Sequence, residues 1–310
     1  MLAAFFGDTH GNINTMYAMT KSWEKRTGLE IDLVVQIGDF GFWLSEDSVD
    51  KMTAKHAKVL IEKMAERGDR IRAVCGDYPE YVLGELVAPK KTLVIRGNHE
   101  DQEYLMSREK QLQAEHPDDY LTRTIEMVPN MFYLPDGHVI EIDGVKFGAL
   151  GGNFSSKTFV TWDYWDPHRE KRVRYGEKRR LNHFTRDRWE LLARSEMDVL
   201  LLHDAPTGMD LVTGRVLAVS EDQILSPAQE RVFSLPEDEI TKQIYGQAGC
   251  PALTELIEIV KPKYVYCGHW HQYRRKGFNI NKHGHAETEV TVLNQTGLPP
   301  KHDCMVVTEL

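Results

Sequence analysis

Five short apolar runs along the chain have the length of buried β-strands. Each is rich in β-branched or aromatic side chains, and together they comprise residues 2–6, 31–37, 92–95, 199–202 and 264–266. Five further segments are rich in good helix formers, and their apolar positions recur at spacings of three and four residues. They are residues 14–26, 49–67, 102–115, 184–195 and 251–260. Strands that alternate with helices in this way predict an α/β fold.

The middle of the chain departs from this alternation. Residues 131–134, 138–142 and 145–150 are apolar runs separated by Asp136-Gly137 and Asp143-Gly144, and such pairs are typical of tight turns. We expect successive antiparallel strands here, and therefore a second, partly antiparallel sheet. Residues 289–293 and 304–308 predict further strands near the end of the sequence.

Length and composition are those of a globular protein. The 310 residues, 41% hydrophobic and 27% charged, correspond to about two domains or to one large α/β domain with insertions. No apolar run reaches the ~18 residues of a membrane-spanning helix, and residues 2–6 lack the features of a signal peptide. Four cysteines without a CxxC pair favour neither a disulfide framework nor a thiolate zinc site. We expect a cytoplasmic protein without a membrane partner.

The charge balance excludes one class of partner. The chain has 38 basic and 47 acidic residues, a net charge of −9, so we do not expect it to coat DNA through a bulk positive field. Residues 169–188 nevertheless hold nine Lys or Arg against three acidic residues. With Trp162, Trp165 and Tyr175 nearby, this stretch has a composition that stacks bases and neutralises phosphates. A solvated, charged surface helix is the alternative.

Side chains of the kinds that bind metals follow all five apolar runs. In chain order they are Asp8, His10, Asp39, Asn98, His203, His269 and His271. Because ligands of open α/β sheets bind outside the carboxyl ends of the strands, we expect these seven side chains to lie together at one edge. They exceed the needs of one metal, and their nitrogen and oxygen donors suit manganese, iron or zinc. The sequence thus predicts two divalent ions ~3.5–4 Å apart, an arrangement that hydrolyses phosphoesters.

The motifs that carry these residues resemble, in order, the five signature motifs of the calcineurin-like metallophosphoesterase superfamily. They are Asp8-x-His10, Gly38-Asp39, Gly97-Asn98-His99-Glu100, His203 and Gly268-His269-x-His271. The resemblance implies an α/β fold of the αββα type, in which two mixed β-sheets are flanked by helices. It also implies a single domain over residues 1–310, with a basic and aromatic insertion near 155–188 and a long loop near 205–247.

The same resemblance implies a role for each motif residue. Asp8, His10 and His271 would hold one metal, whereas Asn98, His203 and His269 would hold the other. Asp39 would bridge both, so that a hydroxide between the metals attacks phosphorus. His99 would lie beside the metals and assist the leaving group. For Arg96, two roles stay open: a bidentate clamp on a phosphate oxygen or a structural salt bridge.

A narrower resemblance is to the RNA lariat debranching branch of this superfamily. It rests on Gly38-Asp39-Phe40, Tyr133-Leu134-Pro135, Gly151-Gly152-Asn153-Phe154-Ser155 and His203-Asp204-x-Pro206. The debranching enzymes carry Cys where this chain has Asp8, so the resemblance implies a nucleotide or RNA phosphodiester as substrate rather than lariat debranching itself.

Two other functions stay open. A phosphomonoesterase or Ser/Thr protein phosphatase would use the same metal site, although protein phosphatases have an Asp-Arg pair where Phe40-Gly41 follows Asp39 in this chain. A non-catalytic scaffold would have a degenerate metal site, whereas all seven expected ligands are present here.

Overall fold

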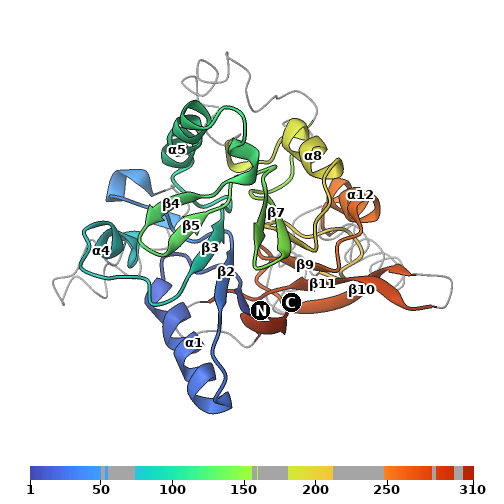
Figure 1. Cartoon of the computed structure of the whole chain (residues 1–310), viewed down its shortest axis with the longest axis horizontal. Helices are drawn as coiled ribbons and strands as arrows, with labels where there is room; N and C mark the ends of the chain where they lie inside the picture. Colours follow the sequence, from blue (N-terminus) through green and yellow to red (C-terminus); the bar gives the residue numbers. More distant parts are fainter. Residues whose placement is uncertain are drawn as a thin grey trace, which may run out of the picture.

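The computed structural model describes residues 1–49, 53–54, 74–155, 159, 181–211, 248–280, 284–296 and 303–310. Two six-stranded mixed sheets lie within these residues. Helices α1, α4 and α5 and helices α8 and α12 lie on opposite sides of the pair of sheets (Figure 1). The expected sandwich of two mixed sheets flanked by helices is therefore confirmed.

The first sheet has the strand order β12-β1-β2-β3-β5-β4, and its four central strands are parallel. The two edge strands, β12 and β4, run antiparallel to their neighbours. The strands are β1 (Leu2–Phe6), β2 (Leu33–Ile37), β3 (Thr92–Ile95), β4 (Ile125–Val128), β5 (Met131–Tyr133) and β12 (Met305–Glu309). The helices of this half are α1 (Ile13–Thr27), α4 (Tyr78–Val82) and α5 (Gln102–Glu115), with 3₁₀ turns η1 (Glu46–Ser48) and η3 (Tyr120–Thr122).

The second sheet has the order β10-β11-β9-β8-β7-β6, again with four parallel strands in the centre. Its antiparallel edges are β10 and β6. The strands are β6 (Val139–Ile142), β7 (Val145–Leu150), β8 (Val199–Leu202), β9 (Tyr264–Cys267), β10 (Arg274–Ile280) and β11 (Ala286–Val292). The helices of this half are α8 (Arg186–Ala193) and α12 (Pro251–Val260). None of the helices in the described ranges is long and apolar enough to cross a membrane.

Both faces of each sheet are buried. Side chains alternate along a strand, so Val34 of β2 packs in the cluster with α1 whereas Val35 packs in the cluster between the sheets. Phe5 of β1 stacks on Tyr266 of β9 across that interface, with ring centroids 3.6 Å apart. Burial on both faces explains why these strands are continuous apolar runs in the sequence.

Local signals set the ends of several helices. The side chain of Asp101 caps α5 by accepting a hydrogen bond from the Tyr104 amide. Pro251 occupies the first position of α12, where no helical hydrogen bond is lost. Gly28 ends α1 in the left-handed conformation that glycine adopts without strain.

The structure corrects the expected pairing in the middle of the chain. Residues 131–134 do not pair with 138–142, because β5 lies parallel to β3 in the first sheet. The antiparallel pair is β6 with β7, in the second sheet. Asp136-Gly137 thus lies where the chain crosses between sheets, a long-range feature that local turn propensity does not reveal. Most of the predicted helix over 49–67 and of the segments 155–188 and 205–247 lies outside the described residues.

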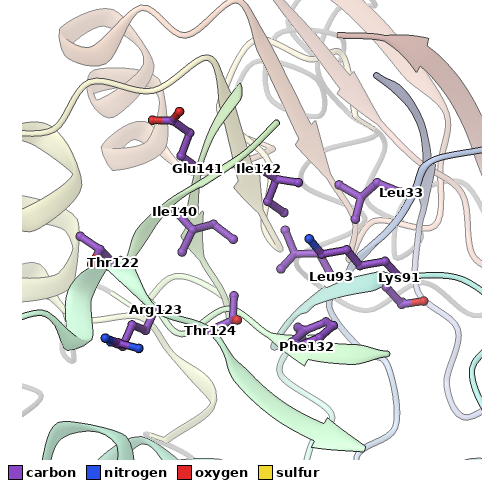
Figure 2. A pocket seen from close by; sticks show the side chains of 11 residues that line it. Leu33, Lys91, Leu93, Thr122, Arg123, Thr124, Phe132, Ile140, Glu141 and Ile142 are labelled. Atoms are coloured by element: carbon purple, nitrogen blue, oxygen red, sulfur yellow. The ribbon is translucent and has the colours of Figure 1, made fainter. Parts of the chain in front are cut away.

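A cavity of about 340 Å³ opens between the sheets at the amino ends of β2 and β3. Apolar side chains, among them Leu33, Leu93 and Ile140, line it together with the exposed Lys91 (Figure 2). The expected metal ligands follow the carboxyl ends of these strands, so this cavity is separate from them.

A buried ion pair joins the two sheets. Arg96, directly after β3, is 3% exposed and donates through Nε to Asp136 Oδ2 at 2.9 Å. Its Nη1 donates to the carbonyl of Leu181 at 2.8 Å. The other oxygen of Asp136 accepts from the amide of Gly151, which follows β7, at 2.6 Å. These contacts favour the structural salt bridge for Arg96 over the phosphate clamp.

Replacing Asp136 by Ala should lower the free energy of unfolding by about 3–5 kcal/mol, because the guanidinium of Arg96 loses its buried partner. The matched control is Asp119→Ala, since Asp119 accepts from Arg123 in the same way at the surface. That change should leave stability nearly unchanged. Urea denaturation followed by circular dichroism measures both, and equal losses would contradict the role of the Arg96 pair.

Candidate metal centre

The carboxyl ends of five parallel strands meet at one edge of the sandwich. Loops after β1, β2 and β3 come from the first sheet, and loops after β8 and β9 come from the second. The expected side chains lie in these loops, and contacts between the sheets join them. The His269 amide donates to Asp8 Oδ1 at 2.9 Å, and His203 Nδ1 lies 3.0 Å from the carbonyl oxygen of Ile37.

Asp8, His10 and His271 form a first group whose ligand atoms all lie within 4.8 Å of one another. Asp8 Oδ2 lies 2.8 Å from His271 Nε2 and 3.9 Å from His10 Nε2. The two Nε2 atoms are 3.3 Å apart. One carboxylate oxygen and two imidazole nitrogens in this arrangement fit a divalent cation.

Asp39, His203 and His269 form a second such group, with ligand atoms all within 4.8 Å of one another. Asn98 joins it, since its Oδ1 lies 3.0 Å from His203 Nε2. Asp39 also contacts the loop of the first group, because its backbone carbonyl accepts from the His10 amide at 2.7 Å. Asp39 is therefore a member of the second group that also contacts the first through its backbone.

His203 faces oxygen atoms through both ring nitrogens. The Ile37 carbonyl only accepts, so Nδ1 carries the proton of the neutral ring. Nε2 then presents a lone pair to Asn98 Oδ1 at 3.0 Å and to Asp39 Oδ1 at 3.4 Å. A cation placed between this lone pair and the Asp39 carboxylate oxygen, either a proton or a metal ion, would stabilise the contact.

The pKa shifts of the site agree with this reading. Burial lowers the pKa of His203, but the charge of Asp39 and a hydrogen bond to it raise the pKa more, to about 10. Burial raises the pKa of Asp8, yet its hydrogen bond with His271 holds that pKa below the usual value. Burial lowers the pKa of His10 and of His269. Metals require anionic carboxylates and neutral imidazoles; the lowered pKa values of Asp8, His10 and His269 favour these forms, whereas His203 must lose a proton to bind a metal.

The backbone of the site is held in unusual conformations. His10, Asp39, His269 and His271 have φ angles of 45°, 51°, 65° and 52°, in the left-handed region that side-chain-bearing residues rarely adopt. Close packing maintains them: a Cβ on Gly97 would lie 2.1 Å from Asp39 Oδ1, and one on Gly268 would lie 2.4 Å from Asp8 Oδ1. Glycine is therefore required next to these carboxylates.

Glu100 holds two of the loops together, a role that the sequence motif did not reveal. Its buried carboxylate accepts from the amides of Phe40, Gly41 and Phe42 at 2.7–3.0 Å. Burial and the charge of Asp39 raise the pKa of Glu100 to about 7, despite these donors. Glu100 follows β3 and the three amides follow β2, so this contact fixes Asp39 relative to Asn98. Three consecutive amide donors could not be assigned to one carboxylate before the fold was known.

His99 lies beside the first group. Its ring centroid is 5.8 Å from that of His10, and its backbone amide donates to Asp39 Oδ1 at 2.7 Å. Its Nδ1 is 3.3 Å from Thr53 Oγ1. The imidazole is thus close to the ligand groups without belonging to either.

The family model of the calcineurin-like phosphoesterases matches residues 1–273 of this chain. Among known proteins, the chain is similar to a lariat debranching enzyme of Drosophila melanogaster, with 25% identity over 278 residues. That match covers 87% of this chain and 43% of the relative.

Other proteins described as lariat debranching enzymes show a similar relationship. The match in Danio rerio is 24% identical and covers 87% of this chain and 40% of the relative. The one in Entamoeba histolytica is 24% identical and covers 86% of this chain and 63% of the relative. The chain thus spans about half the length of these relatives.

Binding of Mn²⁺ at pH 7–9 should release about one proton from His203, because the metal bond needs the nitrogen that holds the second proton. With the pKa of His203 raised to about 10, the proton is mostly bound at pH 7–9, and metal affinity should rise as the pH approaches 10. Isothermal titration calorimetry in buffers of different ionisation enthalpy measures the release. His203→Gln should abolish it, and the control His116→Gln, at a half-buried histidine away from the ligand groups, should not. Metal binding without proton release at pH 7 would contradict this account.

Proposed function

Because this chain belongs to the calcineurin-like phosphoesterase family, we propose that it is a dinuclear-metal-dependent phosphodiesterase acting on a nucleotide or RNA phosphodiester. The observation that carries the proposal is the pair of ligand groups Asp8–His10–His271 and Asp39–His203–His269 at the meeting edge of the sheets. Each group draws on both sheets, and the two groups share the loop after β9, which carries His269 and His271.

One ion would be held by Asp8, His10 and His271, and the other by Asn98, His203 and His269, with Asp39 between them. Nitrogen and oxygen donors without a thiolate favour manganese, with iron or zinc as alternatives. When bound, two such ions neutralise charge on the phosphoryl oxygens and lower the pKa of an attacking water molecule.

The chain's own residues orient the metal ligands and supply a proton to the leaving oxygen. The amides of His99 and His269 donate to Asp39 and Asp8, so each carboxylate keeps a fixed direction. His203 is oriented by its bond to the Ile37 carbonyl. The contact of Nδ1 with Thr53 orients the His99 ring, and we assign its Nε2 as the atom that gives a proton to the leaving oxygen.

The proposed substrate class rests on the relatives. They are described as lariat debranching enzymes, and each match covers 87% of this chain. Asp8 is a carboxylate at the position where the narrower resemblance has Cys, so the proposal extends to a nucleotide-type phosphodiester and not to the lariat branch point.

The Mn²⁺-loaded protein should hydrolyse bis-p-nitrophenyl phosphate and 2′,3′-cyclic AMP faster than p-nitrophenyl phosphate. Asp39→Ala removes the carboxylate between the two ligand groups, so both metal content and turnover should be lost. Release of p-nitrophenolate and of AMP, together with metal analysis of the dialysed proteins, measures this. Preference for the monoester would replace the proposal by a phosphatase.

His99→Ala should lower turnover of 2′,3′-cyclic AMP, whose leaving group is an alkoxide, by about 10²–10⁴-fold, the range typical of a lost general acid, while both metals stay bound. The matched control is His138→Ala, which removes a buried imidazole bonded to the Arg123 carbonyl, away from the ligand groups. Metal analysis and steady-state kinetics distinguish the two variants. Metal loss in His99→Ala equal to that in Asp39→Ala would overturn the role of His99.

A further inference from the structure

Trp270 lies between two of the residues assigned to the metals, His269 and His271, and has no role in the proposed chemistry. Its indole is partly exposed and packs on the apolar cluster of the second sheet. Its ring centroid is 6.0 Å from that of His269, with the two planes at 84°. The structure thus places a large aromatic surface directly beside the second ligand group.

The orientation of this indole is fixed by a buried carboxylate. Trp270 Nε1 donates to Asp204 Oδ1 at 2.9 Å. Asp204 is 7% exposed and also accepts from the amides of Ala205 and Phe154, at 2.8 and 3.1 Å. Because Asp204 directly follows His203, the same loop that carries one expected ligand also holds the indole in place.

A fixed and partly exposed aromatic ring beside a phosphate site is suited to one kind of contact. Nucleobases stack on such rings through their flat faces, and the contact tolerates any base because every base has a π-face. A ring already held by a hydrogen bond loses little conformational entropy when a ligand stacks on it.

We propose that Trp270 is the stacking surface for the nucleobase next to the bound phosphate, and therefore a specificity-determining residue for nucleotide substrates. The inference rests on the proposed function, since it takes the two ligand groups as the phosphate site. It adds that recognition of the base is carried by the last ligand motif itself.

The test compares binding of adenosine 5′-monophosphate with binding of ribose 5-phosphate, which has the same phosphate and sugar but no base. In calorimetric titrations of the Mn²⁺-loaded protein, Trp270→Leu should weaken AMP binding by about tenfold, within the range measured for loss of one stacked base. Binding of ribose 5-phosphate should be unchanged. Trp270→Phe keeps an aromatic face and should recover most of the AMP affinity.

Phe278→Leu is the matched control, because Phe278 is another partly buried ring packed on the same apolar cluster. It should leave both affinities unchanged. An equal loss for both ligands in Trp270→Leu would mean that the indole only supports the metal ligands, and no loss for AMP would mean that it makes no contact; either result overturns the inference.

Hydrolysis of methyl p-nitrophenyl phosphate, which has no base, tests the proposed function separately. If wild type does not cleave this ester, the phosphodiesterase proposal fails, while a loss confined to AMP binding would still support stacking on Trp270. If wild type cleaves it and Trp270→Leu binds AMP normally, only the stacking inference fails.

Discussion

Asp8 and Asp39 are buried carboxylates, with 0% and 1% of their surface exposed. Their negative charges must be matched by nearby positive charges or hydrogen-bond donors. His271, His203 and the backbone amides of neighbouring loops provide this match. The requirement brings together loops from strands that are far apart in the sequence. It also explains why the loops adopt left-handed conformations and contain glycines that let the chains approach within a few ångströms.

Interior elements of the fold were predictable because buried strands and helices leave a pattern of apolar residues in the sequence. The predicted ranges for β1, β3, β8, α5 and α12 agree with the structure to the residue, since each is an apolar run or an amphipathic segment with a clear end signal. The edge strands β4 and β10 were missed because one side of an edge strand faces solvent and tolerates charge. In β10 this leaves Arg-Arg-Lys-Gly at its start. The sheet to which β5 belongs depends on its distant partner β3 and was predicted wrongly.

The residues of the candidate site also divide into those that the sequence predicted and those that it did not. Side chains that follow strand ends could be expected to converge, and the motifs that contain them identified the family that the comparison confirms. Residues that act through distant partners could not be assigned. The role of Arg96 depends on its ion pair with Asp136, and the role of Glu100 depends on hydrogen bonds from three amides of another loop. Trp270 depends on Asp204, 66 positions earlier in the chain.

Each ligand group combines residues from the first sheet with residues from the second: Asp8 and His10 with His271, and Asp39 with His203 and His269. Ions bound there would act as cross-links between the two halves of the sandwich. Separation of the sheets would then require loss of both ions, so metal affinity adds directly to the stability of the fold. The rate at which the ions leave would also set how long the native protein resists proteases and irreversible unfolding.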